Sequence, residues 1–332
     1  MRLGIQFQPP LGVKELVEVA RRADGLGYDS FWLTDTAVGS DPFAVLATIA
    51  GATDRIRLAT GVASIFHRHP VTLAGVARTV DDLSDGRMIL GLGTSHREMM
   101  ERLLGVPWRK PLTAMKEAVT IIHDLLDGKR VDFDGTQYRV HAKLDPAPRR
   151  RVPVFIGAIQ SKMLQYAGSA AEGVMLNHLI PSYAPTVIEE IRRGATGAGR
   201  RPEDVEIVVS VPTYVAQSPE EARQARATRK EMLGFYVGLN IYRRRYTNMG
   251  FGAEMDAIAG AIERGEPVAP LVPDAMVDQM VNAGSAEECR DVIDRYRAAG
   301  ADAVLIVPIF PPGDLSPFFR TIEALAPARI AG

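Results

Sequence analysis

Residues 2–33, RLGIQFQPPLGVKELVEVARRADGLGYDSFWL, contain one complete strand–helix–strand repeat. The segment 2–7 has the alternating pattern of a β-strand, and 13–26 places apolar residues at helical spacing before Gly27. A second strand is expected over 30–33. Because strand–helix–strand repeats are typical of parallel sheets covered by helices, this stretch predicts an α/β fold.

The same alternation continues along the rest of the chain. Further strands are predicted at 56–62, 88–92, 154–156, 173–176, 205–215 and 303–307. Eight such strands, each followed by helix, are the number that closes into a (β/α)8 TIM barrel, so we expect one barrel domain over 1–332. An open doubly wound sheet is the alternative, but it usually has fewer units and a nucleotide-binding fingerprint that this chain lacks.

Two segments depart from the repeat. Residues 131–140 are expected to form a small surface hairpin around Asp134 and Gly135. Residues 219–283, between the seventh and eighth strands, are too many for an ordinary loop and have helical character. We expect this insertion to form a helical cap over the barrel mouth, where the C-terminal ends of the strands meet.

The composition excludes several classes of protein. A chain of 332 residues with 46% hydrophobic and 24% charged residues is globular rather than disordered or fibrous. Its 39 basic and 40 acidic side chains give a net charge of −1, so we expect neither nucleic acid nor a membrane surface as a partner. The single cysteine, Cys289, cannot form an internal disulfide, and no signal peptide or membrane-spanning run is recognisable. These features predict a cytoplasmic protein.

Two loops at the expected barrel mouth are suited to an anion. In a TIM barrel the active site lies at the C-terminal ends of the strands, and a helix that starts there offers free backbone N–H groups to negative charge. The residues in question are Gly93, Thr94 and Ser95 after the fourth strand and Ile159, Gln160, Ser161 and Lys162 after the fifth. We expect a ligand phosphate on these neighbouring loops, although their glycines could also serve only to end the strands tightly.

Other kinds of site find little support in the sequence. His67 and His69 have no carboxylate at metal-ligand spacing, and no zinc motif or G-x-S-x-G nucleophile motif is present. We therefore expect no metal ion and no nucleophilic hydrolysis. The basic run 243–245 lies beside Tyr236, Tyr242 and Tyr246 and could hold a planar or acidic ligand, but the favoured interpretation is a cap helix with its own apolar core.

A set of short motifs, kept in order along nearly the whole chain, resembles the bacterial luciferase-like superfamily. The motifs are FWLTD at 31–35, TGV at 60–62, RHP at 68–70, LSDGR at 83–87, GLG at 91–93 and PVFIGA at 153–158. The resemblance implies a (β/α)8 barrel that uses either FMN or the deazaflavin coenzyme F420.

Within this superfamily, the run 61–70 is most similar to methylenetetrahydromethanopterin reductase, a deazaflavin enzyme. The resemblance implies a non-prolyl cis peptide at Gly61–Val62, in a bulge of strand three that continues to Ala63 and supports the deazaflavin ring. It also implies that the coenzyme phosphate lies on the loops after strands four and five. The argument from helix N-termini selects the same two loops.

The resemblance also suggests catalytic groups. Asp35 is expected to hydrogen-bond the coenzyme ring or to orient the substrate, unless it only caps the turn that follows. Related dehydrogenases commonly carry Asp-His at this place, but here Thr36 follows, and a threonine cannot accept a proton at neutral pH. Alcohol oxidation is therefore disfavoured against reduction of a C=C or C=N bond, with His96 and His178, which can titrate near neutral pH, as candidate proton donors.

Three functions stay open at this point. The preferred one is a coenzyme F420-dependent oxidoreductase acting on a small organic substrate. The alternatives are an FMN-dependent monooxygenase of the same superfamily and a barrel that binds a flavin without catalysis. A homodimer is expected because members of the superfamily are often dimers.

Overall fold

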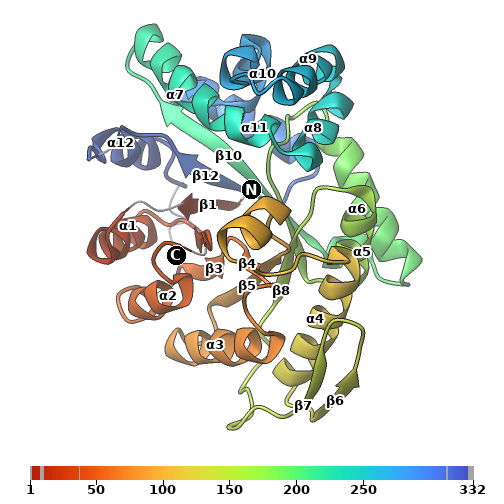
Figure 1. The fold of residues 1–332 in the computed structure, drawn as a ribbon. Helices are drawn as coiled ribbons and strands as arrows, with labels where there is room; N and C mark the ends of the chain where they lie inside the picture. Colours follow the sequence, from red (N-terminus) through yellow and green to blue (C-terminus); the bar gives the residue numbers. More distant parts are fainter. Residues whose placement is uncertain (1, 8–10, 37, 312, 328–332) are drawn as a thin grey trace.

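Eight parallel strands form a closed ring in the computed structural model, which describes residues 2–7, 11–36, 38–311 and 313–327 (Figure 1). The strands are, in ring order, β1 (Arg2–Phe7), β2 (Ser30–Leu33), β3 (Arg57–Thr60), β5 (Met88–Gly93), β8 (Val154–Gly157), β9 (Gly173–Leu176), β10 (Glu206–Val215) and β12 (Ala303–Pro308). The pairing of β12 with β1 closes the ring. The predicted TIM barrel is confirmed.

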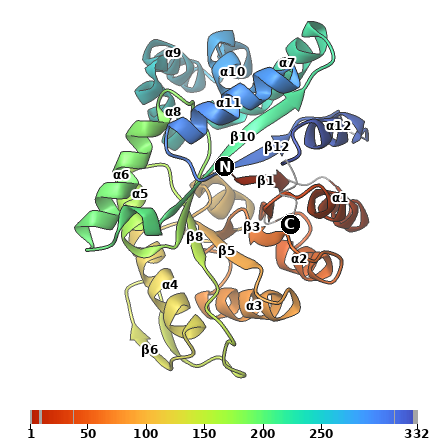
Figure 2. The ribbon, with the colours of Figure 1, turned by 180° about the vertical axis from the view of Figure 1, so that it is seen from behind.

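Helices surround this ring on all sides (Figures 1 and 2). They are α1 (Val13–Gly25), α2 (Pro42–Ala50), α3 (Pro70–Leu83), α4 (Pro111–Leu126), α5 (Ser161–Ala170), α6 (Ala184–Gly197), α11 (Ala286–Ala298) and α12 (Ser316–Ala324). Local sequence sets where they start. For example, the Asp41 carboxylate accepts the N–H groups of Phe43 and Ala44 at the start of α2, and Pro42 suits the first turn. Within the described part of the chain, no helix is both long enough and apolar enough to cross a membrane.

The interior of the barrel is filled by a small apolar cluster separate from the layer under the helices. Its buried members are Trp32, Ala59, Ile89, Phe155, Met175, Val208, Ala303 and Leu305. Trp32 is the largest, and its indole N–H donates to Ser30 Oγ at 2.9 Å. A barrel whose interior is packed in this way offers ligands only its ends.

The motif LSDGR has a structural role. The Arg87 guanidinium donates to the carbonyl oxygens of Ala50, Thr53, Ile56 and Ser84 and to the Thr53 hydroxyl. Asp85 and Gly86 have positive φ values, 53° and 90°, in the turn between α3 and β5. The arginine thus joins the ends of two helices to the start of β3, away from the barrel mouth.

The insertion between β10 and β12 is helical except at its end. It contains α7 (Pro219–Val237), α8 (Asn240–Tyr246), α9 (Gly252–Glu263) and α10 (Asp274–Met280), with short turns at Thr247–Phe251 and Ala269–Leu271. Its last residues form the strand β11 (Asn282–Gly284), which pairs with β10, so helix over all of 219–283 is wrong. The reason is that β10 extends beyond the barrel and leaves an edge on which β11 can pair.

The insertion has its own apolar core and lies on one side of the barrel, beside β10 (Figures 1 and 2). That core also includes Ile180, Tyr214 and Ile309, which belong to the loops and strands of the mouth. The insertion therefore covers the side of the mouth formed by β9, β10 and β12 and leaves the side near β2 and β3 to other loops.

The predicted hairpin is confirmed as the antiparallel pair β6 (Val131–Asp134) and β7 (Arg139–Ala142). The Glu117 carboxylate on α4 accepts the N–H groups of Thr136, Gln137 and Tyr138 in its turn. The Tyr138 hydroxyl then donates to the carbonyl of Ile65, at 2.6 Å. The hairpin is thus tied to the chain that leaves strand three.

Candidate active site

Strand three carries a bulge at the barrel mouth. The short strand β4 (Ala63–Ser64) continues β3, and both pair with β5. Ala59 is opposite Ile89 and Ala63 is opposite Leu92, so four steps along one strand face three along the other. The Gly61–Val62 peptide within it is cis. The bulge and the cis peptide implied by the family resemblance are thus present, and we refer to residues 60–63 as the β3 bulge.

Glycines at the ends of two neighbouring strands make room for the side chain of Val62. A Cβ added to Gly93 would lie 2.4 Å from Val62 Cγ2, and one added to Gly157 would lie 3.0 Å from Cγ1. Val62 packs on the interior cluster of the barrel and remains partly exposed at the mouth. Val62, Gly93 and Gly157, at the ends of strands three, four and five, therefore come together in one apolar surface.

The loop after β5 is held by Trp108, a residue for which the sequence suggested no role. Its indole N–H donates to the carbonyl of Thr94 at 2.8 Å, and its ring lies 6.0 Å from the ring of Phe66. Ser95 has a positive φ of 53° in this loop. A helical segment follows this loop, as expected. It is short, because after Arg97 it consists only of a π-helix over Glu98–Leu103.

The loop after β8 leads into α5 and offers backbone groups rather than hydroxyls. The Ser161 hydroxyl donates to Glu190 of α6 at 2.8 Å, and the Gln160 amide donates to the carbonyl of Ile241 in α8. The first backbone N–H groups of a helix have no intrahelical acceptor, so those of Ser161 and Lys162 suit an anion. The predicted phosphate contacts through Thr94, Ser95 and residues 159–162 stay predictions.

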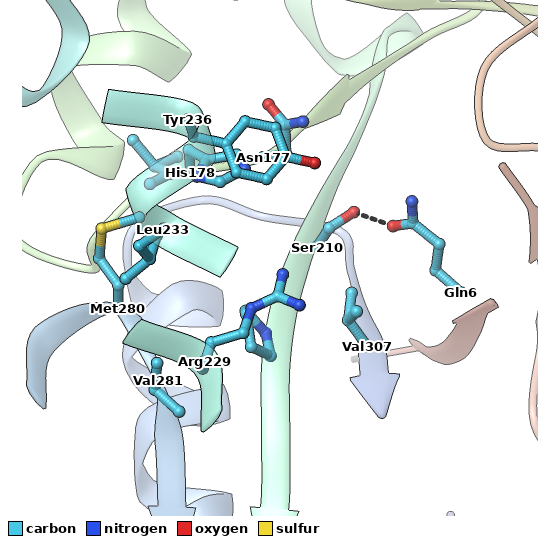
Figure 3. A pocket seen from close by; sticks show the side chains of 12 residues that line it. Gln6, Asn177, His178, Ser210, Arg229, Leu233, Tyr236, Met280, Val281 and Val307 are labelled. Atoms are coloured by element: carbon cyan, nitrogen blue, oxygen red, sulfur yellow. Dashed lines mark hydrogen bonds between the residues drawn. The ribbon is translucent and has the colours of Figure 1, made fainter. Parts of the chain in front are cut away.

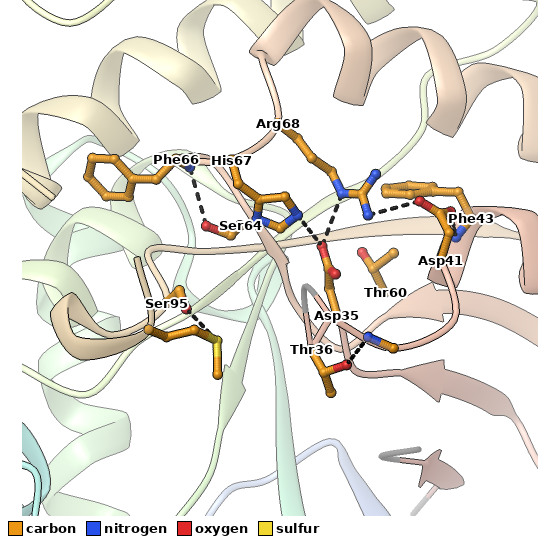
Figure 4. Close-up of polar contacts among 12 residues, drawn as sticks. Asp35, Thr36, Asp41, Phe43, Thr60, Ser64, Phe66, His67, Arg68 and Ser95 are labelled. Carbon is orange, nitrogen blue, oxygen red and sulfur yellow. Dashed lines mark hydrogen bonds and ion pairs between the residues drawn. The ribbon is translucent and has the colours of Figure 1, made fainter. Parts of the chain in front are cut away.

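Asp35 lies in a group of ion pairs on the β2 side of the mouth (Figure 4). Its carboxylate is 3.0 Å from Arg68 Nε and 3.4 Å from His67 Nε2, and Arg68 also reaches Asp41 at 2.9 Å. Burial lowers the pKa of His67 and outweighs the attraction of Asp35, so this imidazole is neutral at pH 7. The RHP motif therefore orients Asp35, whose role towards a ligand stays a prediction.

A small pocket of about 50 Å³ opens beside the β3 bulge and is partly open to solvent (Figure 3). We call it the mouth pocket, and its polar lining consists of Gln6, Asn177, His178, Ser210, Arg229 and Tyr236. Gln6 accepts from the Ser210 hydroxyl at 2.5 Å and donates to the Thr34 hydroxyl at 3.1 Å, which joins β1, β2 and β10. A Cβ added to Gly61 would lie 3.5 Å from Gln6 Nε2, so the pocket adjoins the bulge.

His96 and His178 come together around Tyr242. The ring of Tyr242 lies 5.5 Å from the ring of His96 and 4.8 Å from that of His178, and Nδ1 of His178 is 2.7 Å from the Tyr246 hydroxyl. His178 also has a positive φ of 49°, which favours glycine and persists only where contacts hold it.

Both histidines are harder to protonate than the sequence suggested. Burial lowers the pKa of His96, and burial followed by the charges of Arg229 and Arg245 lowers the pKa of His178 well below 6.5. Titration of His178 near neutral pH is therefore the wrong expectation, because a sequence does not show burial or neighbouring arginines. A role as proton donor would have to start from a neutral imidazole.

The cap supplies more of the site than expected. Tyr242 and Tyr246 belong to the apolar core of the insertion, as the favoured interpretation held, yet both also contact His178. Arg229 and the polar strand residues Gln6 and Ser210 also line the site, but they were not predicted from the sequence. A polar residue on an otherwise apolar strand is a usable signal for the latter two, whereas Arg229 looks like any surface arginine of a helix. Among the described residues, no group of three or more His, Cys, Asp or Glu side chains could hold a metal ion.

Comparisons with known proteins agree on one relationship. Residues 2–303 match the family model of luciferase-like monooxygenases. A 5,10-methylenetetrahydromethanopterin reductase from Archaeoglobus fulgidus is 30% identical over 312 residues, which are 92% of each chain. The solved coenzyme F420-dependent tetrahydromethanopterin reductase from Methanopyrus kandleri superposes with a TM-score of 0.82 at 24% identity, covering 98% of this chain and 97% of that one. The oxygenating constituent of a Pseudomonas putida 3,6-diketocamphane monooxygenase, in complex with FMN, gives 0.75 at 17% identity, with 98% and 96% covered.

The packing of Val62 against Gly93 predicts that a methyl group added at residue 93 destabilises the folded protein. Gly93→Ala should lower the free energy of unfolding by about 1–3 kcal/mol, because the new Cβ overlaps Val62. Gly51→Ala is the matched control, since its Cβ would meet nothing closer than 4.0 Å, and it should change stability little. Urea unfolding of both variants measures the difference, and equal stabilities would contradict the packing described here.

The lowered pKa of His178 predicts a pH-dependent stability. The unfolded chain binds a proton near pH 6.5 and the folded pocket does not, so stability falls as the pH drops below 6.5. At pH 5 this group should cost at most about 2 kcal/mol relative to pH 8, and His178→Gln should remove that part of the loss. If His178→Gln lost as much stability at low pH as the wild type does, His178 would be protonated in the folded protein without a penalty.

Proposed function

Because the chain belongs to the luciferase-like monooxygenase family, whose members are flavin- and deazaflavin-dependent oxidoreductases, we propose that it is a coenzyme F420-dependent oxidoreductase. The proposed reaction is the reduction of a C=C or C=N bond in a small organic substrate. The observation that carries the proposal is the β3 bulge, with the partly exposed Val62 side chain, directly beside the mouth pocket. Similarity over 92% of the chain to a methylenetetrahydromethanopterin reductase supports the choice of coenzyme.

The residues at the mouth fit a deazaflavin of this kind. Gly61, Val62, Gly93 and Gly157 form an apolar surface on which a planar ring can rest, since no side chain projects from the three glycines. The loop of Thr94 and Ser95 and the first N–H groups of α5 lie at the ends of the adjoining strands and suit a phosphate. Asp35, oriented by Arg68, is the candidate to contact the polar edge of the ring.

When bound, the coenzyme supplies a hydride donor that reacts poorly with oxygen. The contribution of the chain is to seat the ring on the β3 bulge and to hold the substrate in the mouth pocket above it. Gln6, whose position is fixed by Ser210 and Thr34, can orient a polar group of the substrate. These groups are positioned by hydrogen bonds within the barrel, so little reorganisation is needed when the substrate enters.

Reduction of a C=C or C=N bond also requires a proton, and His178 is the candidate source. Burial raises the pKa of the Tyr246 hydroxyl well above its usual value, so this hydroxyl stays protonated. Its hydrogen bond to Nδ1 of His178 would then leave the imidazole proton on Nε2, available to a substrate. His96, on the other side of Tyr242, is the second candidate.

The experiment that tests the proposal is a fluorescence-quenching titration of the protein with oxidised coenzyme F420 and, in parallel, with FMN. We expect saturable binding of F420 and at least about tenfold weaker binding of FMN, with Gly93→Ala weakened for F420 and Gly51→Ala unchanged. Tighter binding of FMN would contradict the proposal and favour the monooxygenase. Binding of neither would remove the proposed chemistry, and F420 binding without oxidation of the reduced coenzyme by any acceptor would favour the non-catalytic barrel.

A further inference from the structure

One cationic side chain in the mouth pocket has no anionic partner among the residues that the structure describes. Arg229 extends from α7 into the pocket towards Ser210, and the residue is only 9% exposed (Figure 3). Its Nε has no hydrogen-bond partner, and NH1 contacts only the sulfur of Met232 at 2.7 Å. In the described ranges, no carboxylate forms an ion pair with it.

The groups that face Arg229 do not supply the missing charge. Burial lowers the pKa of His178 and raises that of the Tyr246 hydroxyl, so both groups are neutral at pH 7, and the other charge near His178 is Arg245. Arg245 is 4% exposed and donates to the carbonyl of Ile159, while its NH1 also lacks a partner. Two buried guanidinium groups, that of Arg229 in the pocket and that of Arg245 behind its lining, therefore act on His178, and neither forms an ion pair with an acid in the described part of the chain.

An unpaired buried charge is costly, because the guanidinium loses water and gains no counter-ion. Consistent with this, burial lowers the pKa of both Arg229 and Arg245, the latter to about 10. Paired arginines elsewhere in the molecule show the contrast: Arg57 contacts both Asp29 and Glu206. A ligand with a negative charge would remove this cost by pairing with the guanidinium.

We propose that the mouth pocket binds the carboxylate of an organic acid, with Arg229 as its ion-pair partner. The inference rests on the proposed function and specifies its substrate class as an organic acid with a reducible bond. The planar guanidinium matches a carboxylate in two parallel hydrogen bonds. Leu233, Met280 and Val281 line the pocket around Arg229 and provide apolar contacts for the carbon skeleton.

Short carboxylates and their neutral amides provide the test. The probes are acetate, crotonate and benzoate, each compared with its primary amide, at an ionic strength matched with sodium chloride. We expect at least one acid to raise the thermal midpoint of the wild type by about 2–4 °C, and its amide not to do so. Arg229→Met should abolish this preference and Arg229→Lys should retain part of it. Arg223→Met, an exposed arginine of the same helix, should behave as the wild type.

The same variants give a second readout without any ligand. Arg229→Met should raise the thermal midpoint of the free protein by about 2–4 °C, because it removes a buried charge that has no partner. A lowered midpoint would show that Arg229 has a structural role and would overturn the inference. So would a wild type that no acid stabilises, or an acid preference that persists in Arg229→Met.

Coenzyme binding, followed by fluorescence on the same proteins, separates this inference from the proposed function. Arg229→Met should bind F420 as the wild type does, because Arg229 is assigned to the substrate. Loss of F420 binding in this variant would assign Arg229 to the acidic tail of the coenzyme and overturn the substrate assignment. A wild type that binds acids through Arg229 but not F420 would overturn the proposed function while upholding the carboxylate site.

Discussion

The contact between Val62 and two glycines is the constraint on which the barrel mouth depends. Val62 fits only because Gly93 and Gly157 leave space at the ends of β5 and β8. The extra residue in strand three brings the side chain of Val62 to that place. The result is an apolar surface at the top of a packed barrel, with the mouth pocket next to it. A planar coenzyme and its substrate can then lie one above the other.

The charges of the mouth are divided between its two sides. On the β2 side, Asp35 and Asp41 share the guanidinium of Arg68, which fixes the carboxylate of Asp35. On the cap side, Arg229 and Arg245 have no acidic partner among the described residues, and burial together with their charge keeps His178 neutral. The β2 side therefore offers a fixed carboxylate to a ligand, whereas the cap side offers positive charge that an anionic ligand would neutralise. The cap insertion supplies this second side, which makes it the natural place for substrate selection.

The sequence predicted the barrel because each strand–helix unit carries its own local signal, as in residues 2–33. The β3 bulge was predicted from the motif that contains Gly61 and Val62, not from periodicity. The mouth pocket was not predicted, because Gln6, Ser210 and Arg229 come from three distant segments and meet only in the folded chain. The low pKa of His178 depends on burial and on arginines that lie more than 50 residues away in sequence. The expected homodimer stays a prediction.

The most direct test of the account is a crystal structure of the protein with coenzyme F420 bound. The account predicts that one face of the deazaflavin ring contacts the Gly61–Val62 peptide and the Val62 side chain. The other face should be open to the mouth pocket, with the Arg229 guanidinium free of the coenzyme. A ring bound away from the β3 bulge, or one held by Arg229, would contradict the assignment of the bulge to the coenzyme and the pocket to the substrate.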